Sequence, residues 1–150
     1  MSLISLASGK SLWRGYEYYK ENRVYYKTSN SATEIEGRVT GNGQTYTVNI
    51  DIEHPRKSHC NCPHADGKRI ICKHMIALYF ASFPKEAEDY YNQVIAYEEE
   101  QEQMQEELDC KIAAYINKLT KGQLQGLVYD LLYNGPEWQF DNFVNENIEW

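Results

Sequence analysis

The sequence contains no apolar run of about eighteen residues, the length that a transmembrane helix requires. Residues 1–10 have no basic leader before an apolar core, so we expect no signal peptide. No glycine-rich phosphate loop occurs in the chain, and no nucleophile or pair of carboxylates stands at a spacing typical of catalysis. These absences predict a cytoplasmic protein that is not an enzyme and has neither a membrane contact nor a small-molecule substrate.

Cysteine is scarce, with four residues in the chain, and three of these lie close together. The segment from Cys60 to His74, CNCPHADGKRIICKH, holds three cysteines and two histidines. In a reducing compartment, clustered cysteines are more often metal ligands than partners in disulfides. The fourth cysteine, Cys110, stands alone in an acidic stretch, where we expect it to act as a small apolar residue.

The ligand-type residues of this segment follow the order Cys-x-Cys, a nine-residue gap and Cys-x-His. In an extended strand, residues two apart point to the same side, so Cys60 and Cys62 can bind one ion together. In a helix such residues lie about 200° apart, so we expect Cys72 just before a helix or at its first residue, and His74 in its first turn. Three thiolates and one imidazole complete the tetrahedral set that zinc prefers and leave no position for a catalytic water. The segment therefore predicts one structural Zn²⁺ ion bound by these four residues.

Two other histidines leave an alternative ligand set open. His59 and His64 lie beside the cysteines, and either could replace a predicted ligand or hydrogen-bond to one. The cysteines could also be ordinary buried thiols, with His74 a core residue. The pairing of ligand-type residues at both ends of one short loop favours the metal site over this alternative.

The formal net charge of −7 is divided unevenly along the chain. Residues 1–80 carry eleven Lys or Arg and seven Asp or Glu, whereas residues 81–150 carry four and fifteen. A basic half favours polyanionic partners, and an acidic half favours basic protein surfaces. The charge of the whole chain is therefore a poor guide to its partners.

The segments before the cysteines predict an α+β fold. Leu12, Tyr16 and Tyr19 recur at helical spacing within residues 11–23, and we interpret these aromatic side chains as core rather than as a nucleic-acid face. A short strand is expected from Val24. The sequence thus predicts an N-terminal helix, a β-hairpin and a zinc knuckle that leads into a helix, in the manner of a ββα finger.

The hairpin has the strongest local signal, Asn42-Gly43 between two alternating runs. Both central residues of a type I′ turn need positive φ, which Asn and Gly tolerate best. With Gly41 opposite Gln44, the apolar residues of both strands fall on one face and the polar residues on the other. We therefore expect a half-buried hairpin in which Val39 faces Tyr46, Gly37 faces Val48 and Ile35 faces Ile50.

The chain changes character after Pro84. Residues 85–119 contain no Gly or Pro and predict one long helix, or two helices that share the charged stretch 98–103. Thr120 and Gln123 fit a capping box at the start of the next helix. A final helix is expected after Pro136, and these helices are expected to form a small acidic bundle.

Two domains are expected from these patterns. The first, residues 1–83, combines the finger with its N-terminal helix. The second, residues 84–150, is an acidic helical region that packs on the finger or extends from it. No internal repeat or long flexible linker separates the two.

The residues of the metal segment resemble the SWIM-type zinc finger. Cys60-x-Cys62 and Cys72-x-His74, followed by an apolar helix, match its ligand pattern, and Cys72-Lys73-His74 matches its common CKH form. The resemblance covers about residues 35–83, including the hairpin, and Arg14-Gly15 resembles segments often found upstream. Members occur beside Swi/Snf-type ATPases in bacteria and in Mutator-type transposases, although no ATPase or transposase motif follows here. The resemblance implies a zinc-binding interaction module that contacts DNA or protein.

Two functional hypotheses follow. In the first, the finger binds DNA or a DNA-associated protein, and the basic residues around it meet phosphates: Arg56, Lys57, Lys68, Arg69 and Lys73. These residues include no obvious set for reading bases, and ordinary solvated charges are an alternative interpretation of them. In the second, the acidic helical half docks a partner protein or another copy of the chain, with no nucleic-acid contact.

Overall fold

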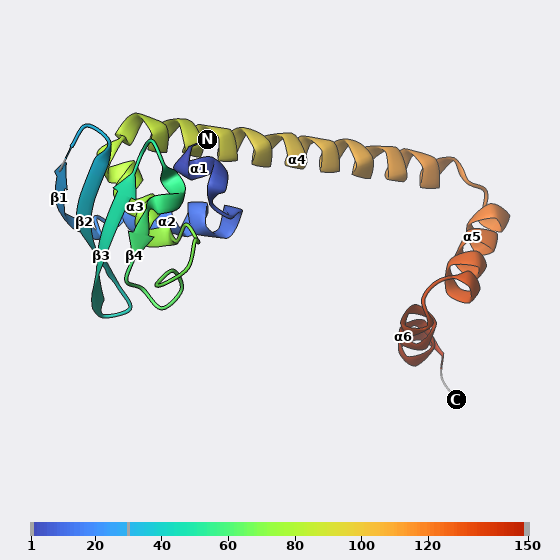
Figure 1. Cartoon of the computed structure of the whole chain (residues 1–150). Coiled ribbons are helices and arrows are strands. Elements are labelled where there is room, and N and C mark those ends of the chain that lie inside the picture. The colour runs from blue at the N-terminus through green and yellow to red at the C-terminus, as the bar shows by residue number, and fades with distance from the viewer. Residues whose placement is uncertain (1, 30, 149–150) are drawn as a thin grey trace. The chain divides into compact units, whose positions relative to one another are not determined.

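The computed structural model describes residues 2–29 and 31–148 (Figure 1). The chain forms two compact units, the finger unit (Met1–Ile95) and the helical unit (Ala96–Trp150). The finger unit combines a sheet with helices, so the predicted α+β class is confirmed. In chain order the elements are α1 (Leu3–Leu6), α2 (Gly9–Lys20), β1 (Val24–Ser29), β2 (Glu34–Gly41), β3 (Gln44–Asp51), the 3₁₀ helix η1 (Pro55–Lys57), β4 (His59–Cys60), α3 (Lys73–Ser82), α4 (Pro84–Lys118), α5 (Lys121–Asn134) and α6 (Glu137–Asn147).

The finger unit is built on an antiparallel sheet with the strand order β1-β2-β3-β4. β2 and β3 pair with Gly41 opposite Gln44 and Val39 opposite Tyr46, which confirms the predicted register. Asn42 and Gly43 have φ values of 51° and 72°, as a type I′ turn requires. Because the alternation matches the pleat, one face of the hairpin is buried while the other stays in solvent.

Helix α3 packs against this sheet, and α2 packs against α3. α3 is buried from His74 to Phe80 because it is covered on both sides. Gly15 of α2 permits the close approach, since a Cβ at this position would lie 2.5 Å from Cβ of Ile76. The finger unit thus has a core of its own, whose largest fully buried side chains are Phe80, Leu3, Ile50, Met75, Ile76, Leu78, Val39, Val48, Cys60 and Cys72.

The first turns of α4 belong to the finger unit. Pro84 ends the pattern of α3 as predicted, but a new helix begins at this residue. Ala87 is buried, and the ring of Tyr91 stacks on that of Tyr16 with centroids 5.3 Å apart. This packing explains why the two units divide after Ile95, inside α4.

The helical unit contains the rest of α4 together with α5 and α6. α4 is one continuous helix of 35 residues, and Thr120 and Gln123 form the predicted capping box. α5 and α6 contact each other, yet no described residue from 96 to 148 is buried. The expected acidic bundle therefore has no buried core among the described residues, because the apolar side chains of these helices stay exposed. In the described ranges, no helix is long and apolar enough to cross a membrane.

Candidate metal centre

The four predicted ligands lie at the end of a strand and the start of a helix. Cys60 ends β4, and Cys62 begins the turn that follows, where its carbonyl accepts a hydrogen bond from the N–H of Ala65 at 3.0 Å. Cys72 is the N-cap residue of α3, and His74 lies in the first turn of this helix. This is the placement that the spacing of the residues predicts, since two positions inside one helix could not face the same ion.

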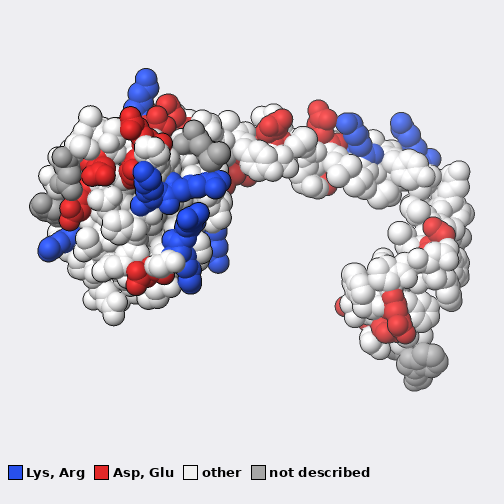
Figure 2. All heavy atoms as spheres, viewed as in Figure 1, with Lys and Arg blue, Asp and Glu red and all other residues white. Residues whose placement is uncertain are grey.

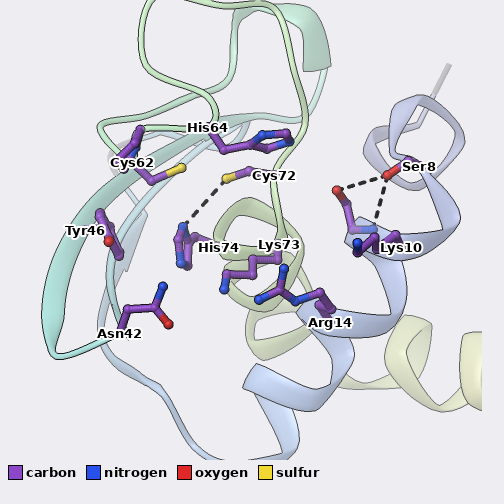
Figure 3. Close-up of a pocket in the computed structure, with 12 residues that line it drawn as sticks. Ser8, Lys10, Arg14, Asn42, Tyr46, Cys62, His64, Cys72, Lys73 and His74 are labelled. Carbon is purple, nitrogen blue, oxygen red and sulfur yellow. Dashed lines mark hydrogen bonds between the residues drawn. The ribbon is translucent and has the colours of Figure 1, made fainter.

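The structure brings these four side chains together. Their ligand atoms lie within 4.8 Å of one another, and all four residues are buried. Nδ1 of His74 lies 3.7 Å from Sγ of Cys60 and 3.9 Å from Sγ of Cys72. Tetrahedral bonds of about 2.3 Å to sulfur and about 2.0 Å to nitrogen would separate these atoms by about 3.5 Å. The group therefore fits one structural zinc ion with Nδ1 as the imidazole ligand, and Figure 3 shows Cys62, Cys72 and His74 converging on a common centre.

The thiols differ in their acidity in the metal-free fold. A hydrogen bond from the Cys60 thiol lowers the pKa of Cys72 to about 4, against the opposing effect of burial, and His74 contributes to the lowering. The same interaction with Cys72 raises the pKa of Cys60, and burial raises the pKa of Cys62. At neutral pH the metal-free centre therefore holds one thiolate and two protonated thiols. A bound zinc ion would replace these two protons with its own positive charge.

The imidazole of His74 is held by residues that the sequence did not link to the metal site. The ring of Tyr46 stacks on it with centroids 4.4 Å apart, and the ring of Tyr18 lies 5.6 Å away. Gly41 passes so close that a Cβ there would lie 2.9 Å from Nε2 of His74. The hairpin register placed Tyr46 on the buried face, but the contact itself depends on tertiary packing, which no local pattern reveals.

The alternative ligands lie outside this group. His59 is exposed on β4 next to the buried Cys60, and His64 is exposed in the loop. Cys110 is an exposed residue of α4 in the helical unit. Among the described residues, His74 is therefore the histidine that joins the three cysteines in the metal group.

The five basic residues proposed from the sequence lie in three places. Arg56 and Lys57 form the last turn of η1, while Lys68 and Arg69 are exposed in the loop between the ligand pairs. Lys73 lies in the first turn of α3, where its ammonium donates a hydrogen bond of 2.6 Å to the hydroxyl of Tyr18. Figure 2 shows Lys and Arg side chains gathered on the visible face of the finger unit, over α1, the start of α2 and the loop that leads to α3.

Comparison with known families matches residues 46–82 to the SWIM zinc finger. The match begins in β3, includes the four residues of the metal group and ends with α3. The resemblance noted from the ligand spacing is therefore confirmed for this segment. No curated protein and no solved structure matches the chain.

Proposed function

We propose that the chain is a non-enzymatic interaction module whose finger holds one structural zinc ion and contacts DNA or a DNA-handling protein. The proposal rests on the closed metal centre, in which Cys60, Cys62, Cys72 and His74 supply four ligands to one ion. A zinc ion with four protein ligands has no open position for water or substrate. Its role is to fasten the end of β4 to the start of α3 and to brace the loop between them.

DNA is the favoured partner of the finger because of the charges on the braced loop and beside it. Lys68 and Arg69 are exposed on this loop, and Arg56 and Lys57 are exposed just before it. The phosphates of a nucleic acid attract such residues without regard to base sequence. Since the whole chain carries a net charge of −7, binding should be weak and strongly dependent on salt.

A salt titration of the zinc-loaded full chain with labelled duplex and single-stranded DNA tests this partner. For the duplex, the logarithm of the association constant should fall with the logarithm of salt concentration, by about 0.9 for each phosphate contacted. Lys68→Glu plus Arg69→Glu should weaken binding, whereas the matched change Lys118→Glu plus Lys121→Glu in the helical unit should have little effect. The DNA proposal fails if low salt reveals no binding, or if the two double variants behave alike.

Protein interaction through the helical unit is a second candidate, in which the chain is an adaptor or a homo-oligomer. No described residue from 96 to 148 is buried, although this unit carries many large apolar side chains. Apolar surface of this extent is typical of an interface. Its exposed members are Tyr97, Met104, Leu108, Ile112, Tyr115, Ile116, Val128, Tyr129, Leu131, Tyr133, Trp138, Phe143 and Ile148.

Analytical ultracentrifugation of the full chain distinguishes a homo-oligomer from a monomeric adaptor. A homo-oligomer would sediment at a multiple of the 17.6 kDa chain mass at micromolar concentration. Leu108→Glu plus Ile112→Glu should then return it to a monomer, because both side chains lie on α4 and are exposed. A monomer at every concentration would reject the homo-oligomer and leave the adaptor.

A further inference from the structure

A pocket of about 490 Å³ lies beside the metal centre in the finger unit. The start of α2, the hairpin turn, the loop between the ligand pairs and the start of α3 all contribute to its lining (Figure 3). Three cationic side chains line it, those of Lys10, Arg14 and Lys73, and none of the lining residues is Asp or Glu. Cys62 and Cys72 also line the pocket, and a zinc ion bound by three thiolates leaves one net negative charge, so the three cations remain in excess and favour an anion.

The cations of this pocket have no acidic partner in the described part of the chain. Among the described residues, none of the three forms an ion pair; the salt bridges present join other residues. Lys73 donates to the hydroxyl of Tyr18 and lies 4.4 Å from the centroid of its ring, and neither contact brings a carboxylate to the ammonium. Figure 3 shows the side chains of Arg14 and Lys73 extending into the same space, with Asn42 and His74 on its other side.

The N-terminus of α2 adds hydrogen-bond donors to the same pocket. Ser8 is the N-cap residue, and its Oγ accepts a hydrogen bond of 3.2 Å from the N–H of Ser11. The N–H groups of Gly9 and Lys10 have no partner inside the helix, as in any first turn. The start of a helix favours a phosphate through these groups and through the positive end of the helix dipole.

His74 lines this pocket and is also one of the four residues of the metal group. This residue is only 4% exposed, and its Nε2 has no hydrogen-bond partner among the described residues. Because Nδ1 faces the sulfur atoms, Nε2 carries the proton when a metal occupies Nδ1, so it is a donor. Metal-bound histidines normally donate this hydrogen to an acceptor.

We propose that this pocket binds a phosphate group. A phosphate combines one or two negative charges with several acceptor oxygens, and the pocket offers three cations, the hydroxyl of Ser11, which accepts from that of Ser8, and a helix start. A carboxylate, with two oxygens and one charge, would use fewer of these donors. The proposal rests on the proposed function only for the source of the phosphate, which we assign to a nucleic-acid strand.

Titration of the zinc-loaded full chain with inorganic phosphate, followed by amide NMR, tests the pocket directly. We expect saturable shifts at Lys10, Ser11 and Lys73. Lys10→Ala plus Arg14→Ala should abolish the saturable shift at Ser11, whereas Lys20→Ala plus Lys85→Ala, which removes two exposed cations outside the pocket, should not. Zinc content and the unfolding transition show whether each variant folds. The proposal fails if phosphate shifts none of these amides, or if the pocket variant responds like the unaltered chain.

The source of the phosphate is tested with single strands that differ only in a 5′-phosphate. The phosphorylated strand should bind about tenfold more tightly, as expected for charge-assisted hydrogen bonds, and the pocket variant should remove the difference. If inorganic phosphate binds but neither strand does, the pocket stands and the proposed DNA function fails. If both strands bind equally and the pocket variant changes neither affinity, DNA binding stands and the pocket is not its phosphate site.

Discussion

The ring of Tyr46 stacks on the ring of His74, with centroids 4.4 Å apart and planes inclined by 24°. Tyr46 belongs to β3 and His74 to α3, so the contact joins the sheet to the helix that carries the imidazole. Both residues are buried. The imidazole is therefore oriented by packing as well as by a metal ion.

Tyr46→Ala should weaken zinc binding and destabilise the finger unit, because it removes the ring that supports His74. Loss of a buried aromatic ring costs about 3–5 kcal/mol. Urea unfolding of the zinc-loaded chain and competition with a chromophoric chelator measure the two effects. Tyr46→Phe keeps the ring and loses only a hydroxyl contact of 3.4 Å with Gln44, so it should resemble the unaltered chain. Equal losses of zinc affinity and of stability in both variants would show that the stacked ring does not support His74.

Gly15→Ala should destabilise the packing of α2 on α3. Its Cβ would lie 2.5 Å from Cβ of Ile76 and 2.9 Å from the carbonyl oxygen of Lys73, so the helices would have to separate. Overpacking of this kind costs about 1–3 kcal/mol, measurable as a lower midpoint of unfolding. Gly9→Ala is the control in the same helix, because a Cβ there meets nothing within 4 Å. A loss at Gly9 as large as that at Gly15 would contradict this account.

Zinc affinity should rise with pH. In the metal-free fold the pKa values of Cys60 and Cys62 are raised and both thiols are protonated at neutral pH, whereas the pKa of Cys72 is lowered to about 4. Zinc binds thiolates, so binding at pH 7 should release about two protons, and acidification should favour metal loss. Calorimetric titrations in buffers of different ionisation enthalpy count these protons. Release of none would mean that the thiols are not ligands.

Local patterns in the sequence predicted much of the finger. Asn42-Gly43 defined the hairpin turn, and the alternation around it defined the register down to Ile35 opposite Ile50. The separation of Cys72 and His74 by two positions placed the start of α3, because two such residues inside a helix cannot share one ion. These features depend on neighbours in sequence, so they can be read without a structure.

Features that depend on distant parts of the chain could not be predicted. Tyr18 and Lys73 are 55 positions apart, yet the ammonium of one donates to the hydroxyl of the other. Lys10 and Arg14 line the pocket only because α2 packs on α3. The apolar stripes of the helical unit predicted a bundle. An amphipathic pattern is the same whether its apolar face packs within the chain or binds another protein, so the pattern alone could not distinguish the two.

Zinc content per chain, measured after chelator dialysis and reloading, tests the central claim most directly. The unaltered chain and Cys110→Ser, a control at an exposed cysteine outside the group, should each bind about one zinc ion per chain. Cys72→Ser should bind much less zinc and unfold more readily, because one of four ligands is lost and metal binding contributes to folding. Full zinc occupancy in Cys72→Ser would contradict the assignment of the metal centre.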